Sequence, residues 1–289
     1  MRKIQTMVPA LVIILTGITS GCTRSDKTTS KSVLMATQGF APVNGINMYY
    51  EMQGSGEPLL LIHGGGSTME TTFGRIRDSL ALHYLVIAMD LQAHGRTEDR
   101  NQALSFEQDA DDVYELLRFL KFNKAHLFGF SNGGNTAMRL AMRHPECVDK
   151  LIIASSFYKR DGLIDNFFAG MEHASLENMP QQLKDAFLKV NSNHSKLQMM
   201  HDKDRDRMLG FTDWTDAELS LIKSPTLIII GENDIVKHDH AAKMAELIPN
   251  ATYKIVPGGH GSYIGEVCSE LDKGTISSTL GLINDFLKR

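Results

Sequence analysis

The sequence has few cysteines, a single tryptophan and no excess of basic residues. Its 289 residues include three cysteines and one tryptophan, and 30 Lys and Arg side chains stand against 34 Asp and Glu, for a net charge of -4. The absence of a Lys/Arg stripe argues against a nucleic-acid-binding surface. No repeat with a period of roughly 20 to 50 residues occurs, which excludes a solenoid or a propeller. With 42% hydrophobic and 22% charged residues, the chain is typical of one globular domain with an inserted subdomain.

Motifs for metal and nucleotide cofactors are also missing. The sequence contains no His-Glu-x-x-His and no paired Cys-x-x-Cys, which are the patterns of many zinc sites. His238-Asp239-His240 is too short a pattern to indicate a metal site. No Gly-x-Gly-x-x-Gly follows the first strand, as it does in dinucleotide-binding folds. We therefore predict a protein without cofactors.

Two of the cysteines, Cys147 and Cys268, lie in the body of the chain. They allow a single disulfide, and the sequence leaves open whether it forms. We expect both to be buried as small hydrophobic residues.

A short apolar run near the N-terminus is typical of a signal peptide. Basic residues precede the apolar stretch 7–18, which is too short to span a bilayer comfortably. The sequence Ile-Thr-Ser-Gly-Cys at 18–22 resembles the lipobox of bacterial lipoproteins, although Thr19 stands where an aliphatic residue is commoner. The resemblance implies cleavage after residue 21 and acylation of Cys22.

We therefore expect an exported protein that is anchored to a membrane through lipidated Cys22. Residues 1–21 are predicted to be the signal peptide. Residues 22–37 are polar and rich in Ser, Thr and Lys, and are predicted to form a flexible tether. Ordinary secretion and an uncleaved anchor stay open as alternatives.

Strand and helix patterns alternate over most of the remaining chain. Continuous apolar runs, as expected of strands buried on both faces, are separated by segments with helical spacing. Repeated strand–helix units predict an α/β fold with a mostly parallel sheet flanked by helices. The predicted strands are 47–53, 58–62, 84–89, 125–128, 150–154, 226–230 and 252–256, and the predicted helices are 68–82, 136–142, 241–247, 276–287 and one that starts at 105.

This alternation is interrupted between about 157 and 223, where strand-like runs vanish. We predict a helical cap, 158–222, inserted into an α/β core made of 38–157 and 223–289. The cap is expected over the C-terminal edge of the sheet, where the active sites of open α/β sheets lie. A minority of its large apolar side chains should line a pocket; the set is Phe157, Tyr158, Phe167, Phe168, Met171, Met179, Met199, Met200, Met208, Phe211 and Trp214.

The segment Gly-Phe-Ser-Asn-Gly-Gly at 129–134 stands between a predicted strand and a predicted helix. A Gly-x-Ser-x-Gly sequence in that position forms a tight turn that exposes the serine at the end of the sheet. Glycines flank the serine because a Cβ there would clash. We predict Ser131 as a nucleophile and the backbone N–H of Asn132, at the helix start, as a donor to an oxyanion.

A second donor is predicted in His63-Gly64-Gly65-Gly66, which directly follows an apolar strand. A turn of this composition can point a backbone N–H at the same oxyanion. We assign this role to the amide of Gly65, with Gly64 as the alternative.

Two further candidates also follow predicted strands. Asp234 can orient an imidazole and stabilise its cation, and Glu232, Asp239 and Asp90 are alternatives for this carboxylate. His260 lies in a glycine-rich loop and can reach the serine as a general base.

The order Ser131, Asp234, His260 is that of α/β-hydrolase-fold serine hydrolases, which the chain resembles from about residue 40 onward. The sequence Asp-Leu-Gln-Ala-His-Gly-Arg-Thr at 90–97 resembles the family's Asp-x-x-Gly-His-Gly-x-Ser loop, with departures at its fourth and eighth residues. In the family this loop supplies no member of the triad, which implies a structural role for His94.

The resemblance implies a hydrolase that cleaves a small-molecule carboxylic ester through an acyl-enzyme and a Ser-His-Asp triad. Segments 157–162 and 257–266 resemble a bacterial subgroup that includes esterases of macrolide antibiotics, so a macrolactone, and with it antibiotic resistance, is a candidate. Carbon–carbon bond hydrolysis, amide or peptide hydrolysis and perhydrolysis are alternatives on the same fold. A non-catalytic binding protein is less favoured, because every predicted catalytic group is present.

Overall fold

The computed structural model describes residues 36–289. The predicted signal peptide 1–21, the acylation site Cys22 and residues 22–35 of the predicted tether lie outside this range and stay predictions. Within the part of the chain that is described, no helix combines the length and the hydrophobicity needed to cross a bilayer.

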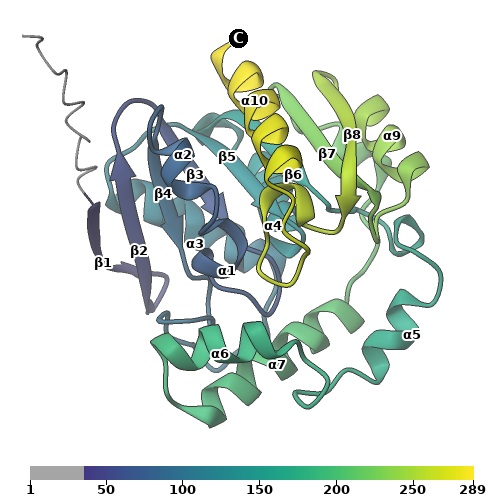
Figure 1. The fold of residues 1–289 in the computed structure, drawn as a ribbon. Coiled ribbons are helices and arrows are strands. Elements are labelled where there is room, and N and C mark those ends of the chain that lie inside the picture. Colours follow the sequence, from purple (N-terminus) through teal and green to yellow (C-terminus); the bar gives the residue numbers. More distant parts are fainter. Residues whose placement is uncertain (1–35) are drawn as a thin grey trace, which may run out of the picture. The chain divides into compact units, whose positions relative to one another are not determined.

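Eight strands form one sheet in the order β1-β2-β4-β3-β5-β6-β7-β8. The pairs β1–β2 and β2–β4 are antiparallel, and the other neighbours are parallel. All the parallel strands therefore end at the same edge of the sheet (Figure 1). The strands are β1 Ala36–Val43, β2 Ile46–Gly54, β3 Pro58–Ile62, β4 Leu85–Met89, β5 Ala125–Phe130, β6 Val148–Ala154, β7 Thr226–Asn233 and β8 Ala251–Gly259.

Helices cover both faces of this sheet. Helices α1, α2 and α10 pack on one face, and α3, α4 and α9 pack on the other (Figure 1). The α-helices are α1 Met69–Phe73, α2 Arg77–Leu80, α3 Phe106–Phe119, α4 Asn132–Arg143, α5 Phe167–Glu172, α6 Gln181–Val190, α7 His194–Leu209, α8 Asp216–Leu219, α9 His238–Leu247 and α10 Lys273–Lys288; short 3-10 turns are η1 Pro145–Cys147, η2 Arg160–Gly162 and η3 Ser262–Ile264.

The central strands β3 to β7 are hydrophobic on both sides because each side meets a helical layer. In β3, Leu60 and Ile62 belong to the core under α3 and α4, whereas Leu59 and Leu61 belong to the core under α1 and α10. All four are fully buried. Burying each such side chain stabilises the fold by about 2 kcal/mol, and the alternation fixes the register of the strand.

Between β6 and β7 the chain forms helices α5–α8, and its β-type pairing there is a single bridge from Leu163 to Val236. Helices α6 and α7 share a small apolar cluster of their own, which includes Phe187, Leu197 and Met200. In Figure 1 these two helices lie beyond the carboxyl ends of the parallel strands. We call residues 158–222 the helical insertion.

Three sequence expectations need correction. Residues 36 and 37, predicted to lie in the tether, belong to β1, since Ala36 pairs with Gln53 of the neighbouring strand. The single helix predicted at 68–82 is two short helices, because the first ends at Gly74, and a turn separates them. Cys147 is buried as expected, but Cys268 is exposed, and neither forms a disulfide within residues 36–289.

Candidate active site

Ser131 lies in the tight turn between β5 and α4. Its backbone has φ 52 and ψ -124, a conformation that costs a non-glycine residue of order 1–3 kcal/mol and persists only where the surroundings enforce it. A Cβ on Gly133 would collide with the carbonyl oxygen of Ile62, and one on Gly129 would collide with the backbone of Gly133. The turn therefore requires the glycines that the sequence analysis singled out.

Asp234 and His260 come together at the ends of β7 and β8. The Nδ1–H of His260 donates to Oδ1 of Asp234 at 2.8 Å. The side chain of Asp234 is fully buried. Burial alone would raise its pKa, but the hydrogen bonds from His260, from the Ser155 hydroxyl and from the Gly231 amide outweigh it and hold the pKa of Asp234 below its usual value.

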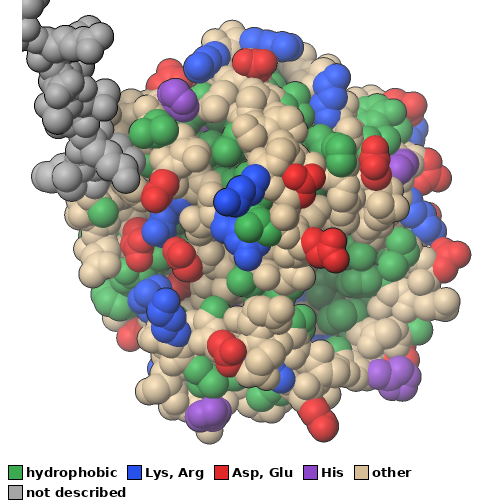
Figure 2. Space-filling view, in the orientation of Figure 1, with side chains coloured by type: hydrophobic (Ala, Val, Ile, Leu, Met, Phe, Trp, Pro, Cys, Tyr) green, Lys and Arg blue, Asp and Glu red, His purple; other side chains and the backbone are tan. Residues whose placement is uncertain are grey.

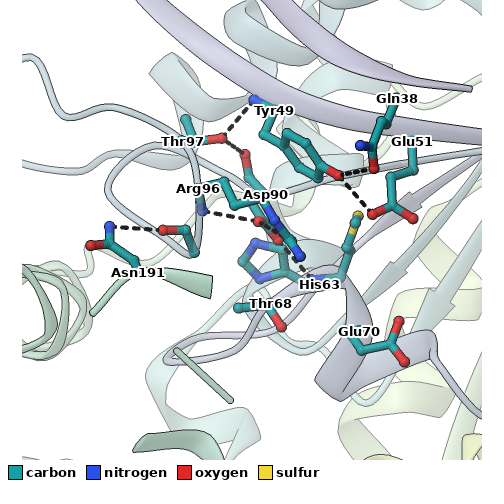
Figure 3. A network of polar contacts seen from close by, with 12 residues as sticks. Gln38, Tyr49, Glu51, His63, Thr68, Glu70, Asp90, Arg96, Thr97 and Asn191 are labelled. Atoms are coloured by element: carbon teal, nitrogen blue, oxygen red, sulfur yellow. Dashed lines mark hydrogen bonds and ion pairs between the residues drawn. The ribbon is translucent and has the colours of Figure 1, made fainter. Parts of the chain in front are cut away.

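The other three carboxylates considered for this position have other surroundings. Glu232 is exposed, and Asp239 accepts a hydrogen bond from the amide of the next residue. Asp90 accepts from the amides of Met69 and Arg96, each at 3.1 Å. Figure 3 shows Asp90 inside a polar network with Thr97 and Tyr49, where it shapes its own loop.

Ser131 and His260 line one cavity. Among the described hydrogen bonds, none joins their side chains, and the ring of His260 packs against Phe130 with centroids 4.8 Å apart. Bonds between a nucleophile and its base are often long without substrate and tighten when substrate binds. The structure thus brings Ser131, Asp234 and His260 to one place.

The two predicted oxyanion donors, Gly65 and Asn132, also line this cavity. The neighbouring amides are engaged elsewhere: Gly64 N–H donates to the Thr72 hydroxyl at 3.3 Å, and Gly66 N–H donates to the Asp204 carboxylate. In the described part of the chain no acceptor is found for the amide of Gly65. Asn132 is the first residue of α4, so its N–H has no partner within the helix.

The family profile described as "alpha/beta hydrolase fold" matches residues 57–185. The uncharacterized hydrolase YraK of Bacillus subtilis (strain 168) is 30% identical over 201 residues, which cover 65% of this chain and 70% of YraK. The chain belongs to the α/β-hydrolase family.

Two proteins similar to this chain differ from each other in their named reactions. The 2-hydroxy-6-oxo-6-(2'-aminophenyl)hexa-2,4-dienoic acid hydrolase of Metapseudomonas resinovorans is 25% identical over 270 residues, which cover 83% of this chain and 90% of that enzyme. The crystal structure of the enol-lactonase from Burkholderia xenovorans LB400 superposes with a TM-score of 0.67 and 20% identity, covering 86% of this chain and 100% of that one. The second likeness shows the fold.

The cavity of this α/β hydrolase has a volume of about 320 Å³. Its floor is the candidate catalytic end of the sheet, and most of its wall is apolar and comes from the helical insertion. Figure 2 shows hydrophobic side chains gathered in a hollow where α5 and α7 approach the sheet in Figure 1. Of the large apolar residues singled out in the sequence, the cavity is lined by Phe157, Phe167, Met171, Met179 and Met208.

Sequence reasoning missed two residues behind the Asp–His pair. The Ser155 hydroxyl donates to Oδ2 of Asp234 and lies 2.6 Å from the hydroxyl oxygen of Tyr263. Tyr263 in turn donates to the carbonyl oxygen of Ile229 at 3.2 Å. Ser155 is the first residue after β6 and has φ 49, so its place at a strand end was the one available signal. Tyr263 carries no pattern that indicates this contact.

Residues 63–66, which carry the amide of Gly65, form what we call the donor loop. Two buried histidines, His63 of this loop and the nearby His94, have partners that fix different protonation states. His63 donates from Nδ1 to the Gly64 carbonyl at 2.8 Å and accepts from the Leu91 amide at Nε2, so its ring is neutral. Burial lowers the pKa of His63 to about 3. His94 is also fully buried, in keeping with the structural role expected of it.

Metal binding has little support in the described residues. Between residues 36 and 289, no three His, Cys, Asp or Glu side chains gather as metal ligands do. The expected absence of a cofactor stays a prediction.

Proposed function

We propose that this α/β hydrolase cleaves carboxylic esters, including lactones, with Ser131 as the nucleophile. One observation supports this above all: Ser131, His260 and two backbone amides without an acceptor among the described residues meet at one cavity, while Asp234 holds the far side of the His260 ring. A nucleophile, a base, an orienting carboxylate and oxyanion donors are the complete set for acyl transfer.

In the proposed reaction, Oγ of Ser131 attacks the ester carbonyl carbon, and Nε2 of His260 takes its proton. Asp234 keeps the Nδ1–H tautomer in place and stabilises the imidazolium. The amides of Gly65 and Asn132 bind the tetrahedral oxyanion, and each such donor contributes about 3 kcal/mol to the transition state. The imidazolium then protonates the leaving alkoxide as the C–O bond breaks.

A water molecule completes the cycle. His260 takes a proton from the water, whose oxygen attacks the acyl carbon, and returns that proton to Ser131 as the acid leaves. An acyclic ester yields an acid and an alcohol. A lactone yields one hydroxy acid, because the alcohol remains attached to the acyl chain.

The cavity supports a partly apolar acyl group of moderate size. Ligand pockets commonly measure about 300–1,000 Å³, so the 320 Å³ of this cavity lies near the lower bound. A macrolactone substrate is supported by the resemblance of segments 157–162 and 257–266 to the subgroup that includes macrolide esterases. Such a ring would lie partly outside the cavity.

The test is hydrolysis of a panel by the purified chain beside Ser131→Ala. The panel holds p-nitrophenyl esters of increasing acyl length and several lactones and macrolactones, read by mass spectrometry for the gain of one water. Turnover that disappears in Ser131→Ala supports the proposal. Turnover that survives in a folded Ser131→Ala would contradict it.

Carbon–carbon bond hydrolysis is a second candidate, supported by the similarity to the Metapseudomonas resinovorans dienoic acid hydrolase. The same Ser131 variant and a dienoate of that type distinguish the two. Ser131-dependent cleavage of the dienoate, with no turnover of esters, would favour this candidate.

We also propose that the protein is exported and anchored through acylated Cys22. The signal-like sequence 1–22 supports this. An anchored hydrolase outside the cytoplasm would meet external esters before they enter the cell.

A further inference from the structure

Helix α7 of the helical insertion forms one wall of the cavity. His201, Asp204, Arg205 and Met208 line the cavity, and their spacing of three, one and three residues places them on one face of a helix. Asp204 differs from the other three because its carboxylate accepts a hydrogen bond from the loop that follows β3.

The carboxylate of Asp204 bonds to the loop that holds the candidate oxyanion donor. Its Oδ2 accepts from the amide of Gly66 and from Nε2 of His94, the latter at 2.8 Å, and its Oδ1 accepts from Arg207. The side chain of Asp204 is 9% exposed. A buried carboxylate with three such donors stays ionised, and its pKa lies well below the usual value despite the burial.

His94 is a cation by the count of its hydrogen bonds. Its Nδ1 faces the carbonyl oxygen of Gln92 at 2.8 Å, and its Nε2 faces the carboxylate of Asp204. Both partners can only accept, so both ring nitrogens carry hydrogen. The charged and titratable groups around this ring are His63, Asp90, Asp204, Arg207 and Asp109.

Arg207 and Asp109 complete a buried chain of alternating charges. Arg207 donates to Asp204 and, at 2.6 Å, to Asp109 of α3. With two carboxylates, one guanidinium and the imidazolium of His94, the chain is neutral. Charge balance of this kind allows four ionic groups to stay buried together.

The contacts of Gly64 and Gly66 together orient the amide of Gly65. His63 holds the carbonyl of Gly64, and in a trans peptide the Gly65 N–H points away from that carbonyl. Asp204 holds the next amide, that of Gly66, which has φ +64. Consecutive glycines have wide conformational freedom, so these bonds supply the order that the sequence lacks.

We propose that Asp204 is a positioning residue for the oxyanion hole: held by His94 and Arg207, it fixes Gly66 and thereby keeps the Gly65 N–H directed into the cavity. This inference rests on the proposed function. It also gives the helical insertion a part in catalysis beyond enclosing the substrate.

The experiment compares Asp204→Leu with the wild type on an ester that the wild type hydrolyses. Asp206→Asn serves as the control, because Asp206 lies on the same helix, is exposed, and among the described residues its carboxylate bonds to Arg205 alone. The kcat is normalised to active sites titrated by burst kinetics. The Ki of a trifluoromethyl ketone is also measured, since its adduct with Ser131 places an oxyanion in the donor site.

We expect kcat per site to fall by about 10- to 100-fold, somewhat less than when a donor itself is removed. KM should stay within about twofold, and the Ki of the ketone should rise by about the same factor as kcat falls. Asp206→Asn should match the wild type.

A charge-balanced variant guards against a failure to fold. Asp204→Leu combined with His94→Leu removes one negative and one positive charge and leaves Arg207 paired with Asp109. The same fall in kcat and in ketone affinity is expected, because Gly66 still lacks its acceptor. The single and the double variant are both measured as the full chain.

Three results would overturn the inference. They are an unchanged kcat per titrated site whatever the thermal stability, a rise of KM alone, and a loss of kcat without loss of ketone affinity. A wild type that hydrolyses no ester would contradict the proposed function instead, and that outcome is visible before any Asp204 variant is made.

Discussion

Replacing Arg207 by leucine should destabilise the protein strongly, because it removes the guanidinium between two buried carboxylates. The side chains of Arg207 and Asp109 are 3% and 1% exposed. His94 still neutralises Asp204, so one buried charge, that of Asp109, is left without a partner. Breaking a buried pair in this way costs about 3–5 kcal/mol, which for a chain of this size lowers Tm by about 6–20 °C.

The loss should also depend on pH. Burial already raises the pKa of Asp109 to about 6 beside its arginine, and removal of Arg207 raises it further. Protonation relieves the unpaired charge, so the variant should lose less stability at acidic pH than at alkaline pH. This pH dependence of the stability loss distinguishes an unpaired carboxylate from a simple packing defect.

Urea and thermal unfolding of Arg207→Leu and Arg205→Leu provide the assay. Arg205 is the matched control, since its side chain is 29% exposed and its partners Asp202 and Asp206 lie at the surface. Exposed pairs of this kind contribute about 0–1 kcal/mol. A loss below about 1 kcal/mol in Arg207→Leu, or equal losses in the two variants, would refute the reasoning from buried charge.

Three other perturbations have definite expected outcomes. Asp234→Asn should lower kcat by about 10⁴-fold, because the tautomer of His260 is no longer fixed, and Glu232→Gln should be neutral; steady-state kinetics that rank them the other way would reassign the carboxylate. Burial alone would lower the pKa of His94, but the adjoining carboxylate of Asp204 outweighs it and raises the pKa above its unfolded value of 6.5. The resulting stability is fully present below that unfolded value and is lost as pH rises through the folded pKa. We therefore expect the free energy of unfolding to decline between about pH 6 and pH 9 in the wild type and not in His94→Gln. Cys22→Ala should abolish incorporation of labelled fatty acid in a bacterial host, and labelling that persists would exclude acylation at this residue.

Most of the fold could be predicted because its pattern is local. Runs such as 58–62 and 227–230 are apolar throughout, since each side of the sheet meets helices. The turns at their ends contain the glycines and catalytic residue types. Strand β1 was not predicted, because an edge strand with one exposed side has a mixed pattern of polar and apolar residues. The break in the helix at 68–82 depends on Gly74, which a helix tolerates at modest cost.

The candidate site likewise has residues that the sequence indicated and one that it did not. Ser131, Asp234 and His260 follow strands and have a recognisable order, so their positions indicated them, although other carboxylates stayed open beside Asp234. Asp204 is separated from His94 by 110 residues and lies in a helix with no distinctive motif. Its contact arises from how the helical insertion packs on the sheet, which one sequence does not reveal.

The four cavity-facing residues of α7 have a consequence for engineering. His201, Arg205 and Met208 share the cavity wall with Asp204, but none of the three has a described bond to the donor loop. A library that varies these three positions and retains Asp204 should therefore change which acyl groups are accepted while sparing the machinery beneath. Diversity introduced at all four positions would yield mostly weakened clones, and their low turnover would be mistaken for poor substrate fit.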